Sequence, residues 1–138
     1  MDTRQRIENL YELTAAGKWD EVEVQLTDDF RIVEADSLPY GGAYEGKDAL
    51  RRLYVTVFAF WADPSLELHD IVVSDDNAVG LLTIHATSRH SGERLAMKVA
   101  EVFHLRGDRI SGITPYYFDA GEVARAAGPV AAPAAEAT

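Results

Sequence analysis

The sequence predicts an α+β fold, a cone-shaped barrel in which three N-terminal helices pack on a curved, mostly antiparallel sheet. Two observations predict this class. Apolar residues recur at helical spacing up to about residue 61, and β-like runs separated by short turns then continue to about residue 118. Strands with such brief links pair as antiparallel hairpins, because parallel neighbours need a crossover of roughly a dozen residues or more. The helices would cover one concave face of the sheet and enclose a cavity.

Two helices are predicted at the N-terminal end. The first covers residues 3–16, because apolar side chains recur there at steps of three and four, and Gly17 can act as its C-terminal cap. The second is short and covers residues 19–26, with its apolar side chains on one side. The polar run Thr27-Asp28-Asp29 interrupts it, and a strand follows over residues 30–35.

A loop or irregular hairpin is predicted over residues 37–46, because Pro39 and three glycines favour turns there. A third helix covers residues 47–61, where apolar residues again recur at steps of three and four, and Asp63-Pro64 ends it. The four β-like runs that follow lie at 66–73, 78–88, 94–105 and 109–118. A last helical turn or two is predicted over residues 121–127.

The composition bounds the possible functions. With 138 residues, 47% of them hydrophobic, the chain supports one domain, placed at residues 1–127, and an Ala- and Pro-rich flexible tail at 128–138. There are 13 Lys and Arg against 23 Asp and Glu, so the net charge is −10 and we expect neither nucleic acid nor a membrane as partner. The absence of cysteine excludes disulfides, thiolate metal sites and cysteine nucleophiles. No signal peptide or membrane span is recognisable, which predicts a soluble, cytoplasmic protein.

Glu101 is the strongest candidate for chemistry. It is the single carboxylate on a strand face whose other residues are apolar, namely Leu95, Met97, Val99, Phe103 and Leu105. We expect Glu101 to point inward, where lost hydration would raise its pKa, as is common for acids at active sites. The alternative is an exposed glutamate at the rim, or one satisfied by an arginine or a backbone group.

Glu34 is the second candidate. Alternation places Phe30, Ile32 and Glu34 on one face of their strand, but periodicity alone does not decide whether that face points to the core or to solvent. A solvated strand residue is therefore the alternative interpretation.

The order of elements and three short strings resemble the nuclear transport factor 2-like superfamily, especially its SnoaL-like and ketosteroid-isomerase-like branches. The strings are Leu26-Thr27-Asp28-Asp29-Phe30, Tyr44-Glu45-Gly46-Lys47-Asp48-Ala49-Leu50 and Tyr116-Tyr117-Phe118-Asp119. The resemblance covers residues 3–127 and implies the cone fold. It does not choose a function, because the superfamily holds isomerases, polyketide cyclases, epoxide hydrolases, dehydratases and non-catalytic carriers.

The resemblance to the isomerase branch implies roles for several residues. The position of the general-base aspartate falls on Glu34, and that of the oxyanion-hole aspartic acid falls on Glu101. The position of a helix tyrosine that helps to hold the oxyanion falls on Leu10. Tyr11 is one place off, a rotation of roughly 100° on a helix, which would remove it from the site. Tyr117 aligns with a pocket-lining aromatic and would supply the missing phenol, unless it is an ordinary core aromatic.

The string at residues 117–119 also resembles the final strand of the epoxide-hydrolase branch. The catalytic aspartate of that branch would fall on Tyr116, and its Arg-x-Asp pair would fall on Leu82 and Ile84, which argues against that water-activating network here. We interpret Asp119 as the N-cap of the short helix that follows it.

Neither a metal nor a cofactor is expected. The four histidines, at 69, 85, 90 and 104, lack the spacing of a metal site, and Gly41-Gly42 lacks the spacing of a phosphate loop. We expect substrate to be bound by Trp19, Phe30, Ile32, Tyr54, Phe58, Trp61, Met97, Val99, Phe103 and Pro115.

Two carboxylates in an apolar cone suit cofactor-free proton transfer next to a carbonyl, because an ionised one can take the proton while a neutral one donates to the enolate. The hypothesis assigns Glu34 as base, Glu101 as donor and Tyr117 as helper, on a small apolar substrate that contains a carbonyl. The alternative is a non-catalytic small-molecule-binding or protein-interaction module of the same fold. A cyclase or dehydratase that uses one acid is a third possibility.

We also expect a homodimer formed through the outer surface of the sheet. The superfamily often dimerises in this way, and Val79, Leu81 and Val102 would otherwise be exposed on their strands.

Overall fold

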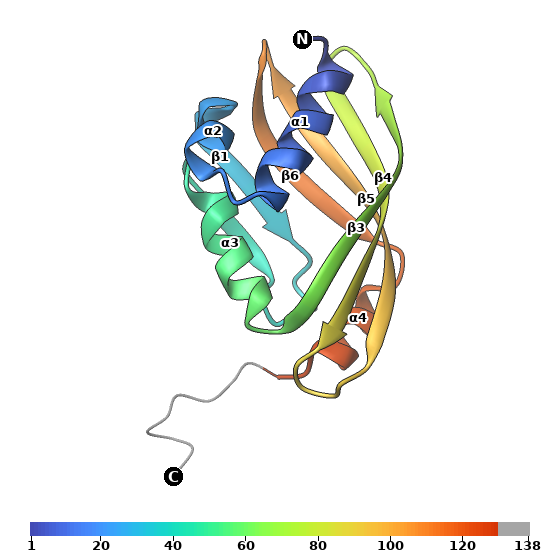
Figure 1. Cartoon of the computed structure of the whole chain (residues 1–138). Coiled ribbons are helices and arrows are strands. Elements are labelled where there is room, and N and C mark those ends of the chain that lie inside the picture. Colours follow the sequence, from blue (N-terminus) through green and yellow to red (C-terminus); the bar gives the residue numbers. More distant parts are fainter. Residues whose placement is uncertain (130–138) are drawn as a thin grey trace.

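Six strands form one curved sheet in the computed structural model, which describes residues 1–129 (Figure 1). The strands are β1 (Leu26–Glu34), β2 (Gly42–Glu45), β3 (Trp61–Val73), β4 (Asn77–Ser88), β5 (Arg94–Arg106) and β6 (Arg109–Tyr117). Their order is β2-β1-β6-β5-β4-β3, and every neighbouring pair is antiparallel except β1 and β6, which are parallel. The predicted α+β class with a mostly antiparallel sheet is confirmed. From residue 130 onward, the predicted tail lies outside the described residues.

Three helices cover the concave face of this sheet (Figure 1). They are α1 (Thr3–Ala15), α2 (Trp19–Val24) and α3 (Ala49–Phe58). Helix α1 starts with a capping box, because the Asp2 side chain accepts a hydrogen bond from the Gln5 N–H and the Gln5 side chain accepts one from the Asp2 N–H. Among residues 1–129, no helix is long and apolar enough to cross a membrane.

A fourth helix, α4 (Ala120–Ala127), lies at the end of the hairpin formed by β4 and β5, away from the other helices (Figure 1). Asp119 accepts a hydrogen bond of 3.0 Å from the N–H of Glu122, which confirms the predicted N-cap. The hydroxyl of Ser88, which is 1% exposed, donates to the carbonyl of Ala126 and so ties α4 to β4.

The second helix is shorter than predicted and the strand after it starts earlier. Helix α2 ends at Val24, and Leu26 already pairs with Ile110 of β6. The pairing is irregular between Leu26 and Arg31, and the two aspartates of the intervening Thr27-Asp28-Asp29 run remain exposed. A polar run in the sequence therefore marks an irregular stretch inside a strand, because a bulge can turn its side chains to solvent.

The end of the third helix also differs from the prediction, which continued it to residue 61. Helix α3 ends at Phe58, and Trp61 opens β3 by pairing with Ser88. The strand then runs through Pro64, where its register with β4 shifts and Asp63 has a positive φ of 50°. Proline is tolerated there because β3 is an edge strand and a bulge needs no hydrogen bond from that position.

The segment predicted as a loop or irregular hairpin contains the short strand β2. Ile32 of β1 pairs with Tyr44 of β2, and the pairing is antiparallel. The hairpin alternative therefore describes this segment correctly.

Candidate active site

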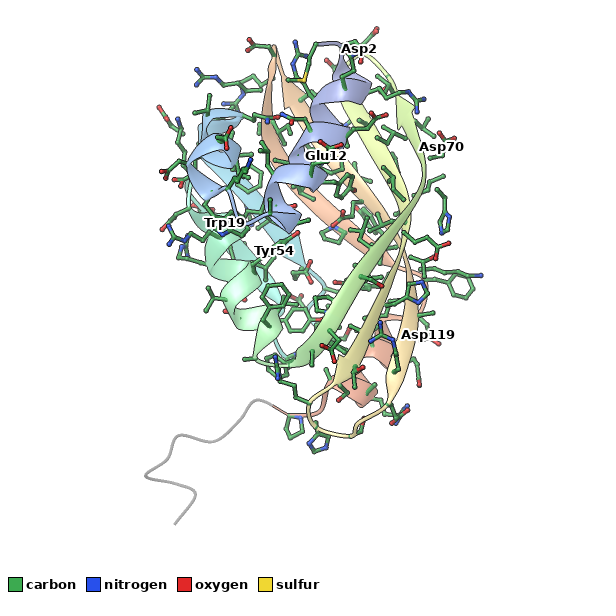
Figure 2. All side chains as sticks on the ribbon, viewed as in Figure 1. Asp2, Glu12, Trp19, Tyr54, Asp70 and Asp119 are labelled. Carbon is green, nitrogen blue, oxygen red and sulfur yellow. The ribbon has the colours of Figure 1, made fainter. Side chains whose placement is uncertain are left out.

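A cavity of about 950 Å³ lies between helices α1, α2 and α3 and the concave face of the sheet. Aromatic and aliphatic side chains make up most of its wall. The ionisable groups on the wall are carboxyls and phenols, namely Glu8, Glu12, Glu34, Glu101, Tyr11, Tyr40, Tyr54 and Tyr117. Figure 2 shows side chains that project into the space between the helices and the sheet.

Glu34, the last residue of β1, points into this cavity and is only 3% exposed. Its Oε2 accepts a hydrogen bond of 3.1 Å from the hydroxyl of Tyr117 on β6. Burial raises the pKa of Glu34 to about 7, the bond from Tyr117 opposes that rise, and the nearby carboxyl of Glu101 adds to it. The tertiary structure thus decides the orientation that strand alternation leaves open, and the carboxyl can take or release a proton near neutral pH.

Glu101 on β5 lines the same cavity, on the face that alternation predicts. Its Oε1 accepts a hydrogen bond of 2.7 Å from the hydroxyl of Tyr11 on α1. Burial raises the pKa of Glu101, and the bond from Tyr11 opposes only part of that rise. Burial and the adjacent Glu101 carboxyl also raise the pKa of Tyr11, which keeps its phenol protonated. The Glu101 carboxyl and the Tyr11 phenol therefore lie together in one wall, joined by a hydrogen bond.

Strand register brings the two carboxyls to the same level of the cone. On one side of β6, Glu101 pairs with Pro115. On its other side, Ile32 pairs with Ile113, so the same parallel register, continued by two residues, places Glu34 beside Pro115 as well. The two backbones are therefore separated by two strand spacings, about 10 Å, with β6 between them. Both side chains leave the concave face, where a bound molecule can touch both.

Tyr11 corrects the prediction that it lies away from the site. Helix α1 crosses the sheet in such a way that Leu10 and Tyr11 both line the cavity. Gly80 of β4 lies opposite Glu101 in the strand pairing, and a Cβ atom at Gly80 would collide with the Tyr11 hydroxyl. The missing side chain leaves the space through which the phenol reaches Glu101. A glycine inside an apolar strand is the sequence signal for such a close approach.

Tyr40 is a cavity residue that no pattern in the sequence predicts. It is 3% exposed, and its hydroxyl accepts a hydrogen bond of 3.2 Å from Nε1 of Trp61. Burial raises the pKa of Tyr40 to about 12, and Glu34 adds to the rise. A lone aromatic residue in a segment of proline and glycine has no periodicity, so no sequence pattern marks it as buried.

Most residues expected to bind substrate do line the cavity. These are Trp19, Ile32, Tyr54, Phe58, Trp61, Met97 and Phe103. Phe30, Val99 and Pro115 do not line it, although all three are buried. Alternation predicts which face of a strand is covered, but not at which points along that face the helices leave a space.

The histidines lie outside the cavity wall. Nε2 of His85 is 2.8 Å from Oε1 of Glu67, and Nε2 of His69 is 2.7 Å from the hydroxyl of Thr83. In residues 1–129, no group of three or more histidine, aspartate or glutamate side chains is arranged to hold a metal ion.

Comparison with known proteins gives one family. The family model of the SnoaL-like domain matches residues 7–113. No curated protein matches the sequence significantly.

Solved structures with the same fold are numerous. An NTF2-like protein of unknown function from Burkholderia pseudomallei K96243 has a TM-score of 0.81 and 22% identity, over 91% of this chain and 98% of its own. A putative SnoaL-like polyketide cyclase from Jannaschia sp. CCS1 has a TM-score of 0.72 and 15% identity, over 94% and 97%. The structure of TerC co-crystallised with polyporic acid has a TM-score of 0.78 and 13% identity, over 89% and 95%. These likenesses confirm the cone fold implied by the sequence resemblance.

Proposed function

Since this chain belongs to the SnoaL-like domain family, we propose that it is an enzyme that transfers a proton next to a carbonyl group, without a cofactor, on a small apolar substrate in the cavity. The observation that carries the proposal is the pair Glu34 and Glu101, two carboxyls in one mostly apolar cavity, each held by a tyrosine. Isomerisation and cyclisation of carbonyl compounds both include such a step. The polyketide-cyclase description of one structural neighbour is consistent with this class of reaction.

Glu34 is the proposed base. Its pKa of about 7 leaves a large ionised fraction at neutral pH and also makes the ionised form basic enough to accept a proton from carbon. Tyr117 donates to Oε2, which leaves Oε1 as the oxygen that can face a substrate. Tyr117 is therefore proposed as a positioning residue, which holds the carboxyl while the proton moves.

Glu101 and Tyr11 are the proposed donors to the substrate oxygen. The raised pKa of Glu101 favours its protonated form, and a protonated carboxyl can donate a hydrogen bond to the negative charge that develops on an enolate. The Tyr11 phenol is 2.7 Å from Glu101 and supplies a second donor or orients the first. When Glu34 takes the proton, negative charge develops on the substrate oxygen, and Glu101 and Tyr11 would stabilise that charge from the opposite side of β6.

A non-catalytic binding module remains the competing function. It would predict a Glu34 that faces outward or is neutralised by an arginine, whereas Glu34 is buried in the cavity and accepts a hydrogen bond from a tyrosine. That observation favours catalysis. A small-molecule ligand suits both functions, and a structural neighbour has been co-crystallised with one.

Exchange of α-protons for deuterium in 2-tetralone, followed by NMR in D₂O, tests the proposal. We expect the wild type to accelerate exchange above the buffer rate and Glu34→Gln to lower the acceleration by about 10²-fold or more, since an amide cannot accept the proton. Glu21→Gln on α2 is the matched control and should leave exchange unchanged. Binding of the ketone with no acceleration by the wild type would favour the binding module.

A homodimer through the outer face of the sheet is part of the proposal. Of the residues expected to be exposed there, Leu81 on β4 is 39% exposed, whereas Val79 and Val102 are half-buried. Val72 on β3 is 52% exposed and Tyr116 on β6 is 60% exposed. Three strands of the sheet therefore carry exposed apolar side chains on this face, which a second copy would cover.

A further inference from the structure

The charges on the cavity wall indicate a ligand class that the proposed reaction leaves open. Glu8 and Glu12 join Glu34 and Glu101 in the lining, and none of the lining residues in the described chain is a lysine, arginine or histidine. We propose that the cavity selects carbonyl compounds that carry a positively charged amino group at the end remote from the carbonyl. This inference rests on the proposed function, because it adds a second group to the substrate of the same site.

Two basic side chains near these helices pair with acids outside the cavity, and Lys18 and Arg51 line a separate pocket beside Trp19. Nζ of Lys47 is 3.3 Å from Asp28, and Nε of Arg52 is 3.2 Å from Asp48. A carboxylate or phosphate on a ligand would therefore find no counter-charge in the lining and would approach several like charges. The net charge of −10 adds a long-range preference of the same sign.

The mouth of the cavity combines acids with aromatic rings. Glu8 and Glu12 are one helical turn apart on α1, are exposed to solvent and also line the cavity, so they lie at its opening. Tyr54 meets Trp19 and Phe58 edge to face, with ring centroids 5.1 Å and 5.7 Å away. Figure 2 shows Glu12, Trp19 and Tyr54 on three different helices on this side of the molecule. Aromatic faces and carboxylates together are the groups that bind ammonium ions in proteins.

The deep end of the cavity provides the place for the carbonyl. Glu34 is only 3% exposed and uses Oε2 to accept a hydrogen bond from Tyr117, while Oε1 has no donor within residues 1–129. Oε2 of Glu101 likewise has no donor there, because Tyr11 binds Oε1. One free oxygen of each carboxyl is thus available to the reacting end of a ligand.

Glu34 and Glu101, at the deep end, act electrostatically on Tyr54, which contacts the aromatic rings of the mouth. The pKa of Tyr54 on α3 rises to about 12, mainly through burial, and both Glu101 and Glu34 add to the rise. Tyr54 also contacts Trp19 and Phe58 at the opening. A cation beside these rings would be attracted by the ionised fraction of Glu34 as well as by Glu8 and Glu12, so the two ends of the ligand act on one connected site.

Three 2-tetralones that differ only at carbon 6 test the inference. The substituents are trimethylammonium, its neutral isostere tert-butyl, and sulfonate. We expect calorimetry at pH 7 and low salt to give at least tenfold tighter binding of the ammonium compound than of the tert-butyl compound, and at least tenfold weaker binding of the sulfonate. Added salt should reduce both ratios, since the mouth is exposed.

Two double variants test whether the preference for the ammonium compound arises at the mouth of the cavity. Glu8→Gln with Glu12→Gln should lower the ammonium preference to less than threefold and leave tert-butyl binding unchanged. Asp75→Asn with Asp76→Asn removes the same charge from the turn between β3 and β4, outside the cavity, and should leave the preference intact. An equal loss in both double variants would overturn the mouth site.

Binding and exchange separate this inference from the proposed function. Equal or tighter binding of the tert-butyl ketone overturns the amino-group preference, and accelerated α-proton exchange of that ketone would still support proton transfer. Preferential binding of the ammonium ketone without exchange of any of the three supports the charge preference and overturns the proposed reaction. Failure of the ammonium ketone to bind overturns the inference whatever the neutral ketone does.

Discussion

Tyr11 and Glu101 lie 90 positions apart in the sequence, and the Tyr11 hydroxyl donates a hydrogen bond of 2.7 Å to Oε1 of Glu101. The bond depends on Gly80, which is the pairing partner of Glu101 on β4 and lies directly under the phenol. A side chain at Gly80 would occupy the position of the hydroxyl. The position of the Tyr11 hydroxyl therefore depends on a residue without a Cβ atom on the strand beside Glu101.

Gly80→Ala should disconnect Tyr11 from Glu101. The added methyl group collides with the Tyr11 hydroxyl, so we expect a loss of about 1–3 kcal/mol in the free energy of unfolding and about 10²-fold slower proton transfer. Chemical denaturation and the exchange assay would measure both effects.

Gly121→Ala in α4 is the matched control, because a Cβ there meets Asp119 at an ordinary 3.7 Å. It should leave both measurements close to wild type. In a Tyr11→Phe background, Gly80→Ala should cost less, since the hydroxyl it displaces is absent. An unchanged cost in that background would show that the methyl group acts elsewhere.

Tyr117→Phe should raise the pKa of Glu34 above about 7. The Tyr117 hydroxyl donates to Oε2 of Glu34, and this bond lowers the pKa of the carboxyl against the larger effect of burial. The alkaline shift should appear in carboxyl-resolved NMR titration and in the pH profile of exchange. Tyr116→Phe changes the adjacent residue, which is 60% exposed, and should leave the titration unchanged. A Glu34 titration unaffected by Tyr117→Phe would contradict the assigned contact.

Glu34→Gln should change how stability depends on pH. The pKa of Glu34 is raised from 4.5 to about 7, so the folded state binds the proton more tightly than the unfolded state. The stabilising contribution is therefore complete below pH 4.5 and is lost as pH rises through about 7, a loss of about 3 kcal/mol.

Urea denaturation between pH 4.5 and 8 would test that sign. The wild type should lose stability relative to Glu34→Gln across this window by about 3 kcal/mol, because the amide cannot ionise. Glu101, whose pKa is also raised, contributes a loss in the same direction to both proteins. Parallel curves for the two proteins would mean that Glu34 titrates normally.

Leu81→Glu should dissociate the proposed homodimer. Leu81 is 39% exposed on the outer face, and a buried unpaired carboxylate there would weaken association by about 10²-fold or more. Light scattering during size exclusion would report the mass. Val55→Glu, at a residue that is 70% exposed on α3, is the control and should leave the mass unchanged. A monomeric wild type at micromolar concentration would refute the dimer.

The layers of this protein follow from local sequence patterns. Periodicity of three to four separated the helices from the strands, and short turns dictated antiparallel pairing. Strand alternation was sufficient to turn Glu101 inward, because one carboxylate on an apolar face leaves little choice of side.

Which side chains meet in the cavity depends on long-range packing. Both faces of the strand at Glu34 mix polar and apolar residues, with Asp36 on one and Arg31 on the other, so its orientation came from the parallel pairing of β1 with β6 across the chain. The rotation of α1 over the sheet placed Tyr11 in the site, and that rotation depends on how Gly80 and Phe103 accept the ring. Local patterns record which face of an element is covered. The space left between two faces depends on side chains that are distant in sequence, and so the cavity and its contacts emerged only with packing.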